Sequence, residues 1–276
     1  MGGLVGSPCF RAGRSIGSVL FALFAASLTG CDAEPTLQAL GIIDVALAVP
    51  VHAVVLLDVS NGSPCSAGVF EDALERLLPE FDARPGSTVE LWELGVGLAD
   101  TRRLGTRSVA PSKHTGSTHT IGSRSIADRE YLLKCAEMAF ARPRKSRSPI
   151  AEGIGRIMLD HRGDGTRHIL LVLSDGREVS ALGDFECGRL PTPDAFTRTL
   201  RARHVLADGS LANTTIMFLS MTLAAASDRG CDMSLDRTQA IETLWSRALS
   251  AAGAQSVRFV YGELPEHIAG GSEDSR

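Results

Sequence analysis

The feature that most constrains the fold is a series of short apolar runs separated by stretches with helical spacing of apolar residues. The runs 52–57 (HAVVLL) and 168–174 (HILLVLS) are apolar almost throughout, and 214–221 and 256–261 are similar. Strands without polar alternation are typical of a sheet buried on both faces. We therefore predict an α/β fold with a doubly wound, mostly parallel six-stranded sheet and helices on both faces.

The remaining elements follow from periodicity. A further strand is predicted at 88–97, and the segment 98–126, rich in Ser, Thr, Gly and Arg, is expected to hold a short edge strand and a long exposed loop. Trp92 and Trp245 fall on apolar faces and are expected in the core. Helices are predicted at 67–81, 127–141, 149–161, 193–207 and 237–253.

Residues 1–30 have the composition of an export signal. Arg11 and Arg14 precede an apolar stretch that begins at Ile16 and gives way to small residues. A basic, an apolar and a small-residue region in this order describe a secretory signal. The apolar stretch falls short of the ~20 residues that span a bilayer, which disfavours a permanent transmembrane helix.

The end of this segment, LTGC at 28–31, resembles the lipobox of bacterial lipoproteins. The resemblance implies that Cys31 carries lipid, begins the mature chain and anchors it to a membrane of the cell envelope, with the domain in the periplasm or on the surface. The alternative is an ordinary cleaved signal with an unrelated cysteine. We expect a lipid-anchored linker at 31–50, one domain at 51–262 and a disordered tail at 263–276.

The charge of the chain argues against a nucleic-acid partner. The formal net charge is −4, and removal of residues 1–30 makes it more negative because Arg11 and Arg14 are lost. Domains that bind nucleic acids normally carry a concentrated basic face. The one basic cluster, RPRKSR at 142–147, is short and is interpreted as a solvated loop.

Polar side chains follow the two strongest strands. Asp58 and Ser60 come directly after the first strand, Asp175 follows the strand 168–174, and Ser148 precedes the helix that leads into it. In a doubly wound sheet, ligands bind beyond the carboxyl ends of the strands, where the strand order reverses. If the two strands are neighbours there, the four side chains converge. Carboxylate and hydroxyl oxygens suit Mg²⁺ or Mn²⁺.

The order of these motifs resembles the von Willebrand factor A domain family over roughly 51–261. DVSNG at 58–62 is similar to the Asp-x-Ser-x-Ser loop of that family, SPIAEGI at 148–154 to its Thr-Pro-Leu-x-Glu-Ala helix start, and LVLSDG at 171–176 to its Thr-Asp-Gly strand end. The resemblance implies a Rossmann-like fold and a metal-ion-dependent adhesion site. Its ligands would be Asp58, Ser60, Ser148 and Asp175.

Two departures from the family pattern concern the metal. Gly62 stands where the family has its second loop serine, so Ser63, one place later, or a water would have to substitute. Ser148 replaces the family's threonine and keeps the hydroxyl. The alternative is a degenerate site that retains the fold and no metal.

Four cysteines lie in the expected domain, and an even number in an exported chain suggests two disulfides. Cys187 and Cys231 each follow a predicted strand and would lie in neighbouring loops at the site, which favours a Cys187–Cys231 bond and leaves Cys65–Cys135 by exclusion. In the alternative, Cys135 is a buried helix residue that stays reduced. The cysteine spacings match no zinc motif.

The resemblance implies a protein-binding module in which an acidic side chain of the partner completes the coordination of the metal. The alternatives are a metal-free scaffold lipoprotein and a metal-dependent hydrolase. The hydrolase is disfavoured because phosphoryl-transfer sites usually add a basic clamp, and only Arg177 lies near the two aspartates. We therefore expect no enzyme. His161, His168 and His204 flank helix and strand ends and are interpreted as solvated or core residues.

Overall fold

The structure is a computed structural model that describes residues 50–82, 84, 86–108, 118–161, 165–221, 229–231 and 233–261. The expected signal segment, the lipidated Cys31, the linker up to residue 49 and the tail at 263–276 lie outside the described residues. Within the described part of the chain, no helix combines the length and the apolar character needed to cross a membrane.

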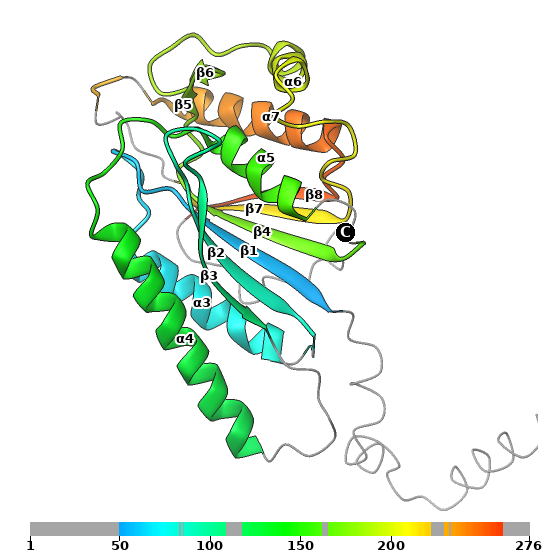
Figure 1. The fold of residues 1–276 in the computed structure, drawn as a ribbon. Helices are drawn as coiled ribbons and strands as arrows, with labels where there is room; N and C mark the ends of the chain where they lie inside the picture. Colours follow the sequence, from blue (N-terminus) through cyan, green and yellow to red (C-terminus); the bar gives the residue numbers. More distant parts are fainter. Residues whose placement is uncertain are drawn as a thin grey trace, which may run out of the picture. The chain divides into compact units, whose positions relative to one another are not determined.

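The described part contains a six-stranded sheet with the order β3-β2-β1-β4-β7-β8 (Figure 1). β1 pairs in parallel with β2 and β4, β7 pairs in parallel with β4 and β8, and only the β2–β3 pair is antiparallel. The doubly wound, mostly parallel sheet predicted from the apolar runs is therefore confirmed. The strands are β1 (Val51–Leu57), β2 (Thr88–Glu93), β3 (Arg102–Ser108), β4 (Arg167–Leu173), β7 (Thr214–Met221) and β8 (Ser256–Tyr261).

Helices cover both faces of this sheet (Figure 1). Two of them pack on one face, α3 (Ala67–Asp82) and α4 (Thr118–Phe140). Three pack on the other, α5 (Ile150–Asp160), α6 (Pro193–Ala202) and α7 (Leu235–Ala251).

Local sequence explains where two of the helices begin. The Thr192 hydroxyl accepts the N–H of Ala195 at the start of α6, with Pro193 in the first turn, and the Ser234 hydroxyl accepts the N–H of Arg237 at the start of α7. Both are favoured N-terminal caps, because they satisfy an N–H that has no partner within the helix.

The alternation of side chains along β1 divides the core into two layers. Ala53 and Val55 belong to the cluster under α3 and α4, whereas Val54 and Leu56 belong to the cluster under α5 and α7. Trp92 and Trp245 are almost fully buried, as predicted from their apolar faces.

Two segments depart from the sequence-based expectation. α4 begins at Thr118, inside the region expected to be an exposed loop. A two-stranded hairpin, β5 (Val179–Ser180) and β6 (Gly183–Asp184), follows the candidate site and was not expected. Strands of two residues are too short to show any periodicity in the sequence.

One of the two expected disulfides forms. Cys187 is bonded to Cys231, with 5.3 Å between their Cα atoms. The expected Cys65–Cys135 bond is wrong, because both residues are free and buried. Cys135 lies on α4 against Gly105 of β3, and Cys65 lies just before α3, so each thiol fills its own place in the core as a small apolar group.

Candidate functional site

The site lies where the strand order reverses. Along the chain β1 is followed by β2 on one side of it in the sheet, whereas β4 lies on its other side. The carboxyl ends of β1 and β4 are therefore neighbours, as the sequence-based prediction required. The N–H of Asp58, just beyond β1, donates to the carbonyl of Leu173 at the end of β4, at 3.1 Å. Such a switch point is the usual ligand-binding place in doubly wound folds.

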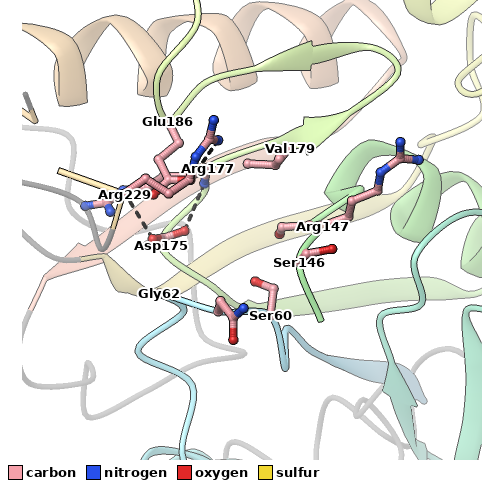
Figure 2. Close-up of a pocket in the computed structure, with 11 residues that line it drawn as sticks. Ser60, Gly62, Ser146, Arg147, Asp175, Arg177, Val179, Glu186 and Arg229 are labelled. Atoms are coloured by element: carbon pink, nitrogen blue, oxygen red, sulfur yellow. Dashed lines mark hydrogen bonds and ion pairs between the residues drawn. The ribbon is translucent and has the colours of Figure 1, made fainter. Parts of the chain in front are cut away.

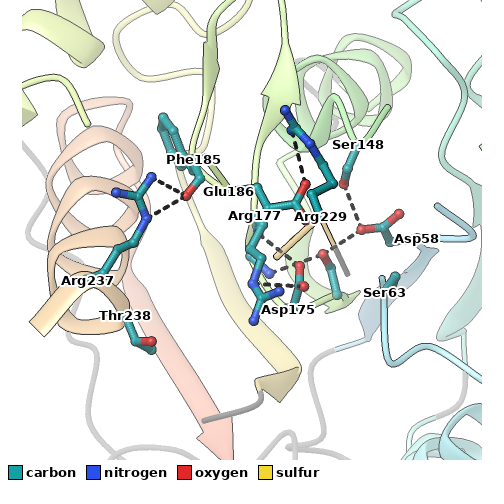
Figure 3. A network of polar contacts seen from close by, with 12 residues as sticks. Asp58, Ser63, Ser148, Asp175, Arg177, Phe185, Glu186, Arg229, Arg237 and Thr238 are labelled. Atoms are coloured by element: carbon teal, nitrogen blue, oxygen red, sulfur yellow. Dashed lines mark hydrogen bonds and ion pairs between the residues drawn. The ribbon is translucent and has the colours of Figure 1, made fainter. Parts of the chain in front are cut away.

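Asp58 is the buried centre of the site (Figure 3). Its Oδ2 accepts hydrogen bonds from the hydroxyls of Ser148 and Ser174, both at 2.7 Å, and its Oδ1 accepts the N–H of Ser60 at 3.0 Å. A hydroxyl that donates its hydrogen to a carboxylate keeps its oxygen lone pairs available. The bond from Ser148 thus fixes the serine without blocking its oxygen as a ligand.

A cavity of about 270 Å³ opens beside these residues (Figure 2). Three of the predicted ligands line it: Ser60, Ser148 and Asp175. Asp58 is held against them by its bonds to Ser60 and Ser148. The other residues that line the cavity are Asn61, Gly62, Ser146, Arg147, Arg177, Val179, Glu186 and Arg229.

Two predicted ligands do not line the cavity: Asp58, which is bonded to residues that do, and Ser63. The Ser63 hydroxyl accepts the N–H of Cys65 at 3.3 Å, which ties it into the turn before α3. Gly62 has a φ of 79°, a left-handed conformation that favours glycine. Gly62 thus lines the cavity at the left-handed turn, and Ser63 is not among the lining residues.

Asp175 carries an unusual proton affinity. Burial, followed by the nearby charge of Asp58, raises its pKa to about 7, although Arg177 opposes the shift. The Nε of Arg177 lies 3.2 Å from Oδ2 of Asp175, and the N–H of Arg177 donates to Oδ1 at 3.0 Å. A positive charge beside the carboxylates of Asp58 and Asp175 is therefore favourable, and the guanidinium of Arg177 supplies one such charge.

The basic segment 142–147 is an exposed loop, as expected, and its side chains also bond to the site. The guanidinium of Arg144 donates to the carbonyls of Ser60, Ser63 and Cys65 at 3.0, 2.9 and 3.2 Å. One side chain thus holds the whole loop that follows Asp58. The sequence could not predict these bonds, because every residue has a backbone carbonyl and no residue type marks the three that accept from Arg144.

The rest of the segment is attached to β2. Glu93 is buried at the end of that strand and forms ion pairs with Arg102, Arg142 and Lys145. The backbone of Lys145 also pairs with the Asp58 loop, because its carbonyl accepts the N–H of Asn61 at 2.7 Å. A buried carboxylate requires partners of this kind.

Glu178 connects the site to α5. Its Oε2 accepts the N–H of Ala151 in the first turn of the helix at 2.9 Å, in place of a cap from the preceding residues. Burial raises the pKa of Glu178 to about 8, despite hydrogen bonds from Ser180 and Ala151 that act in the opposite direction. The helix that begins just after Ser148 is therefore fixed from the strand side of the site.

The disulfide fixes the outer rim of the cavity. Cys187 and Cys231 link the segment after β6 to the segment before α7. The guanidinium of Arg229 then lies 3.2 Å from the carboxylate of Glu186 (Figure 3) and 3.0 Å from that of Asp184. Asp184, Glu186 and Cys187 also come close together, but the Cys187 sulfur belongs to the disulfide and Arg229 neutralises the two carboxylates.

The donor set fits a hard divalent cation. Ser60, Ser148 and Asp175 present oxygen atoms at one cavity, and Asp58 is bonded to two of these residues. Mg²⁺ and Mn²⁺ prefer oxygen ligands and retain several waters, so a few protein ligands suffice. Arg177 acts against a cation at Asp175, because it already carries a positive charge there.

Comparisons with known proteins bear on the fold alone. No protein-family model matches the sequence, and no curated protein matches it. A solved structure of a von Willebrand factor type A from Catenulispora acidiphila is 13% identical at a TM-score of 0.34, over 62% of this chain and 33% of that chain. The PilB minor pilin from Streptococcus sanguinis is 8% identical at a TM-score of 0.41, over 78% of this chain and 57% of that one.

The matched part thus spans a third of the first structure and little more than half of the second. The likeness is distant, and the strand order of this chain carries the conclusion about its architecture. This chain has a doubly wound α/β fold that is compatible with a von Willebrand factor A domain.

Proposed function

We propose that this chain is a protein-binding module that holds a divalent cation, Mg²⁺ or Mn²⁺, at the Asp58 cavity and receives an acidic side chain of a partner protein there. The observation that carries the proposal is the pair of serine hydroxyls, from Ser148 and Ser174, bonded to one buried oxygen of Asp58 at the switch point. This arrangement joins residues from three separate segments beside a cavity that Ser148 lines.

In this proposal Ser60, Ser148 and Asp175 hold the cation. Asp58 either orients Ser60 and Ser148 through its hydrogen bonds or contributes a carboxylate oxygen to the cation itself. When bound, the cation would supply a Lewis-acidic centre for a carboxylate of the partner. Asp58 orients the hydroxyl of Ser148, because the bond to Oδ2 fixes where the serine lone pairs point. Arg144 holds the loop that carries Ser60.

The charges around the cavity support an acidic partner. Three arginines line it, Arg147, Arg177 and Arg229, against two carboxylates, Asp175 and Glu186. Arginine donates in a planar fork that matches a carboxylate. Arg177 is paired with Asp175, and Arg229 with Asp184 and Glu186, so an incoming aspartate or glutamate would meet Arg147 and the cation itself.

The proposal also places the module in the bacterial cell envelope, attached to a membrane through lipid on Cys31. The LTGC motif at 28–31 supports the attachment. The Cys187–Cys231 disulfide is in keeping with an exported chain, because such bonds persist in oxidising compartments. We propose binding as the role of the module and no catalysis.

A metal-free binding module is the second candidate. The ion pair between Arg177 and Asp175 favours it, because the arginine already compensates one of the two carboxylates. The lining favours it as well, because Gly62, which has no ligand atom in its side chain, stands at the cavity in place of Ser63. In this form the arginines alone would bind the acidic side chain of the partner.

Affinity capture distinguishes the two candidates. The full chain, immobilised, is incubated with detergent-solubilised envelope proteins of the source bacterium, in Mn²⁺ or in EDTA, beside an Asp58→Asn variant. The metal-dependent module predicts a protein retained only by the parent in Mn²⁺ and released by EDTA. Equal retention in EDTA would support the metal-free module. Retention of no protein by the parent in either condition would contradict both.

A further inference from the structure

Three histidines gather around Glu90 at the end of the sheet opposite to the Asp58 cavity. His52 lies at the start of β1, His168 at the start of β4, and His161 directly follows α5. The ring centroids of His52 and His161 are 4.2 Å apart, and that of His168 is 5.4 and 5.5 Å from the other two. At the rise of a β-strand, His52 and Asp58 are separated by roughly 20 Å.

Strand geometry explains why these side chains meet. Neighbouring residues in a strand point to opposite faces, so residues two apart share a face. His52 shares a face with Val54, Glu90 with Trp92, and His168 with Leu170, and these three apolar residues all belong to the core layer under α5. His161, at the end of α5, comes from the same side.

The polar atoms converge at distances near those of a metal site. Nε2 of His161 lies 3.2 Å from Oε2 of Glu90, and Nε2 of His52 lies 3.7 Å from Oε1 of Glu90. One ligand atom from each of these residues lies within 4.8 Å of the other two. Two ligands of a tetrahedral zinc ion, with bonds of about 2.0–2.1 Å, are roughly 3.3 Å apart. Small side-chain rotations would therefore bring the ligand atoms of His52, Glu90 and His161 to the spacing of a zinc site.

The Nε2 atom of His52 is buried and has no hydrogen-bond partner among the described residues. Its 3.7 Å separation from Glu90 exceeds the range of a hydrogen bond. A buried polar atom without a partner is uncommon in a folded protein and calls for an explanation. A metal ion between His52 and Glu90 would provide one.

Glu90 is held in place by two further groups. The indole N–H of Trp92 donates to Oε2 and the guanidinium of Arg103 to Oε1, both at 2.8 Å. Carboxylates that bind metals are commonly oriented by such hydrogen bonds. The side chains of His52 and His161 remain 12% and 9% exposed, so an ion can reach them from solvent.

We propose that His52, Glu90 and His161 form a transition-metal site, best suited to Zn²⁺, that is separate from the Asp58 cavity. Two imidazoles and one carboxylate suit zinc, whereas the oxygen donors at Asp58 suit Mg²⁺ or Mn²⁺. The proposal does not depend on the proposed function. The competing interpretation is a hydrogen-bonded cluster of histidines around Glu90 that binds no metal.

Calorimetric titration of the full chain with Zn²⁺ tests the proposal. The protein is first stripped with EDTA, dialysed and saturated with Mg²⁺, so that the Asp58 cavity does not contribute. We expect Zn²⁺ binding that weakens at least tenfold in His52→Asn and in His161→Asn. The matched control is His204→Asn, because His204 is exposed on the loop after α6 and should leave the affinity unchanged.

Parent protein that binds no Zn²⁺, or variants at positions 52 and 161 that bind it as tightly as the control, would overturn the proposal. Circular dichroism checks that each variant is folded. Co²⁺ titration of the parent gives a second readout that needs no variant. A four-coordinate site with nitrogen and oxygen ligands predicts intense visible absorption, displaced by Zn²⁺, and its absence would count against the site.

Discussion

The hydroxyl of Ser148 donates a 2.7 Å hydrogen bond to Oδ2 of Asp58, although the two residues are 90 positions apart. The same carboxylate oxygen accepts the hydroxyl of Ser174 from the neighbouring strand. Asp58 thereby links the ends of β1 and β4 to the start of α5. Loss of any one of these contacts should affect both the local stability and the cation that we propose for the cavity.

Arg144 should stabilise the loop that follows Asp58. In Arg144→Ala, three backbone carbonyls lose a charged donor, so we expect the free energy of unfolding to fall by about 1–3 kcal/mol. Urea unfolding measures the change. Arg147→Ala is the matched control, because Arg147 is an exposed neighbour at the cavity. Equal stability of the two variants would show that the Arg144 contacts contribute nothing.

The Cys187–Cys231 bond should contribute strongly to stability. It joins residues 44 positions apart, so Cys187→Ser combined with Cys231→Ser should lower the free energy of unfolding by roughly 3–4 kcal/mol. Urea unfolding with and without reductant measures it. Reductant should lower the stability of the parent and leave the double variant unchanged. A further loss in the double variant would reveal a second disulfide and contradict the free state of Cys65 and Cys135.

Glu178 should make stability fall as the pH rises. Its pKa is raised from 4.5 to about 8 by burial, so between these values the unfolded chain releases a proton that the folded chain keeps. The free energy of unfolding should therefore decrease by a few kcal/mol over this window, and the contribution is fully present below pH 4.5. Glu178→Gln keeps an acceptor for Ala151 and should remove this part of the slope.

Chemical unfolding at several pH values from 5 to 8 measures the difference between Glu178→Gln and the parent. Glu75→Gln is the matched control, because the Glu75 side chain is 58% exposed and the change should leave the slope as in the parent. An unchanged slope in Glu178→Gln would show that Glu178 is ionised in the folded chain at neutral pH.

Gly62 should be required for its backbone conformation. With a φ of 79°, Gly62→Ala forces an L-residue into the left-handed region, and we expect a loss of about 1–2 kcal/mol. Gly68→Ala provides the contrast, because Gly68 lies in α3 with nothing within 4 Å of an added Cβ. That change should stabilise the chain by about 0.5–1 kcal/mol. Thermal unfolding of both variants measures these changes. A Gly62→Ala variant as stable as the parent would contradict the requirement for glycine at this position.

The sequence predicted the parts of the fold that depend on long periodic segments. The strands at 214–221 and 256–261 have the bounds predicted from their apolar runs, and β1 and β4 are neighbours, which the predicted site required as a condition. The placement of Asp58, Ser148 and Asp175 at one edge was predictable for the same reason, because parallel strands end on the same side of a sheet.

The remaining features depend on contacts that leave no pattern in the chain. The partners of Arg144 are backbone carbonyls, which any sequence provides. That Gly62 lines the cavity and Ser63 does not depends on the local turn, and the sequence shows only that glycine permits a left-handed conformation there. The gathering of His52 and His161 around Glu90 depends on strand register and on where α5 ends.

Titration of the EDTA-treated full chain with Mn²⁺, followed by the electron paramagnetic resonance signal of the free ion, measures whether the Asp58 cavity holds a cation. No Zn²⁺ is added, because it would compete with Mn²⁺ for the same oxygen ligands, and His52→Asn is titrated in parallel to account for Mn²⁺ at the His52 site. We expect one Mn²⁺ bound by the parent, with at least tenfold weaker binding in Asp58→Asn and in Ser148→Ala and unchanged binding in Glu75→Gln, whose side chain is exposed on α3. Parent protein that leaves all the Mn²⁺ free, or that binds it as tightly after both site substitutions, would contradict a metal centre at Asp58.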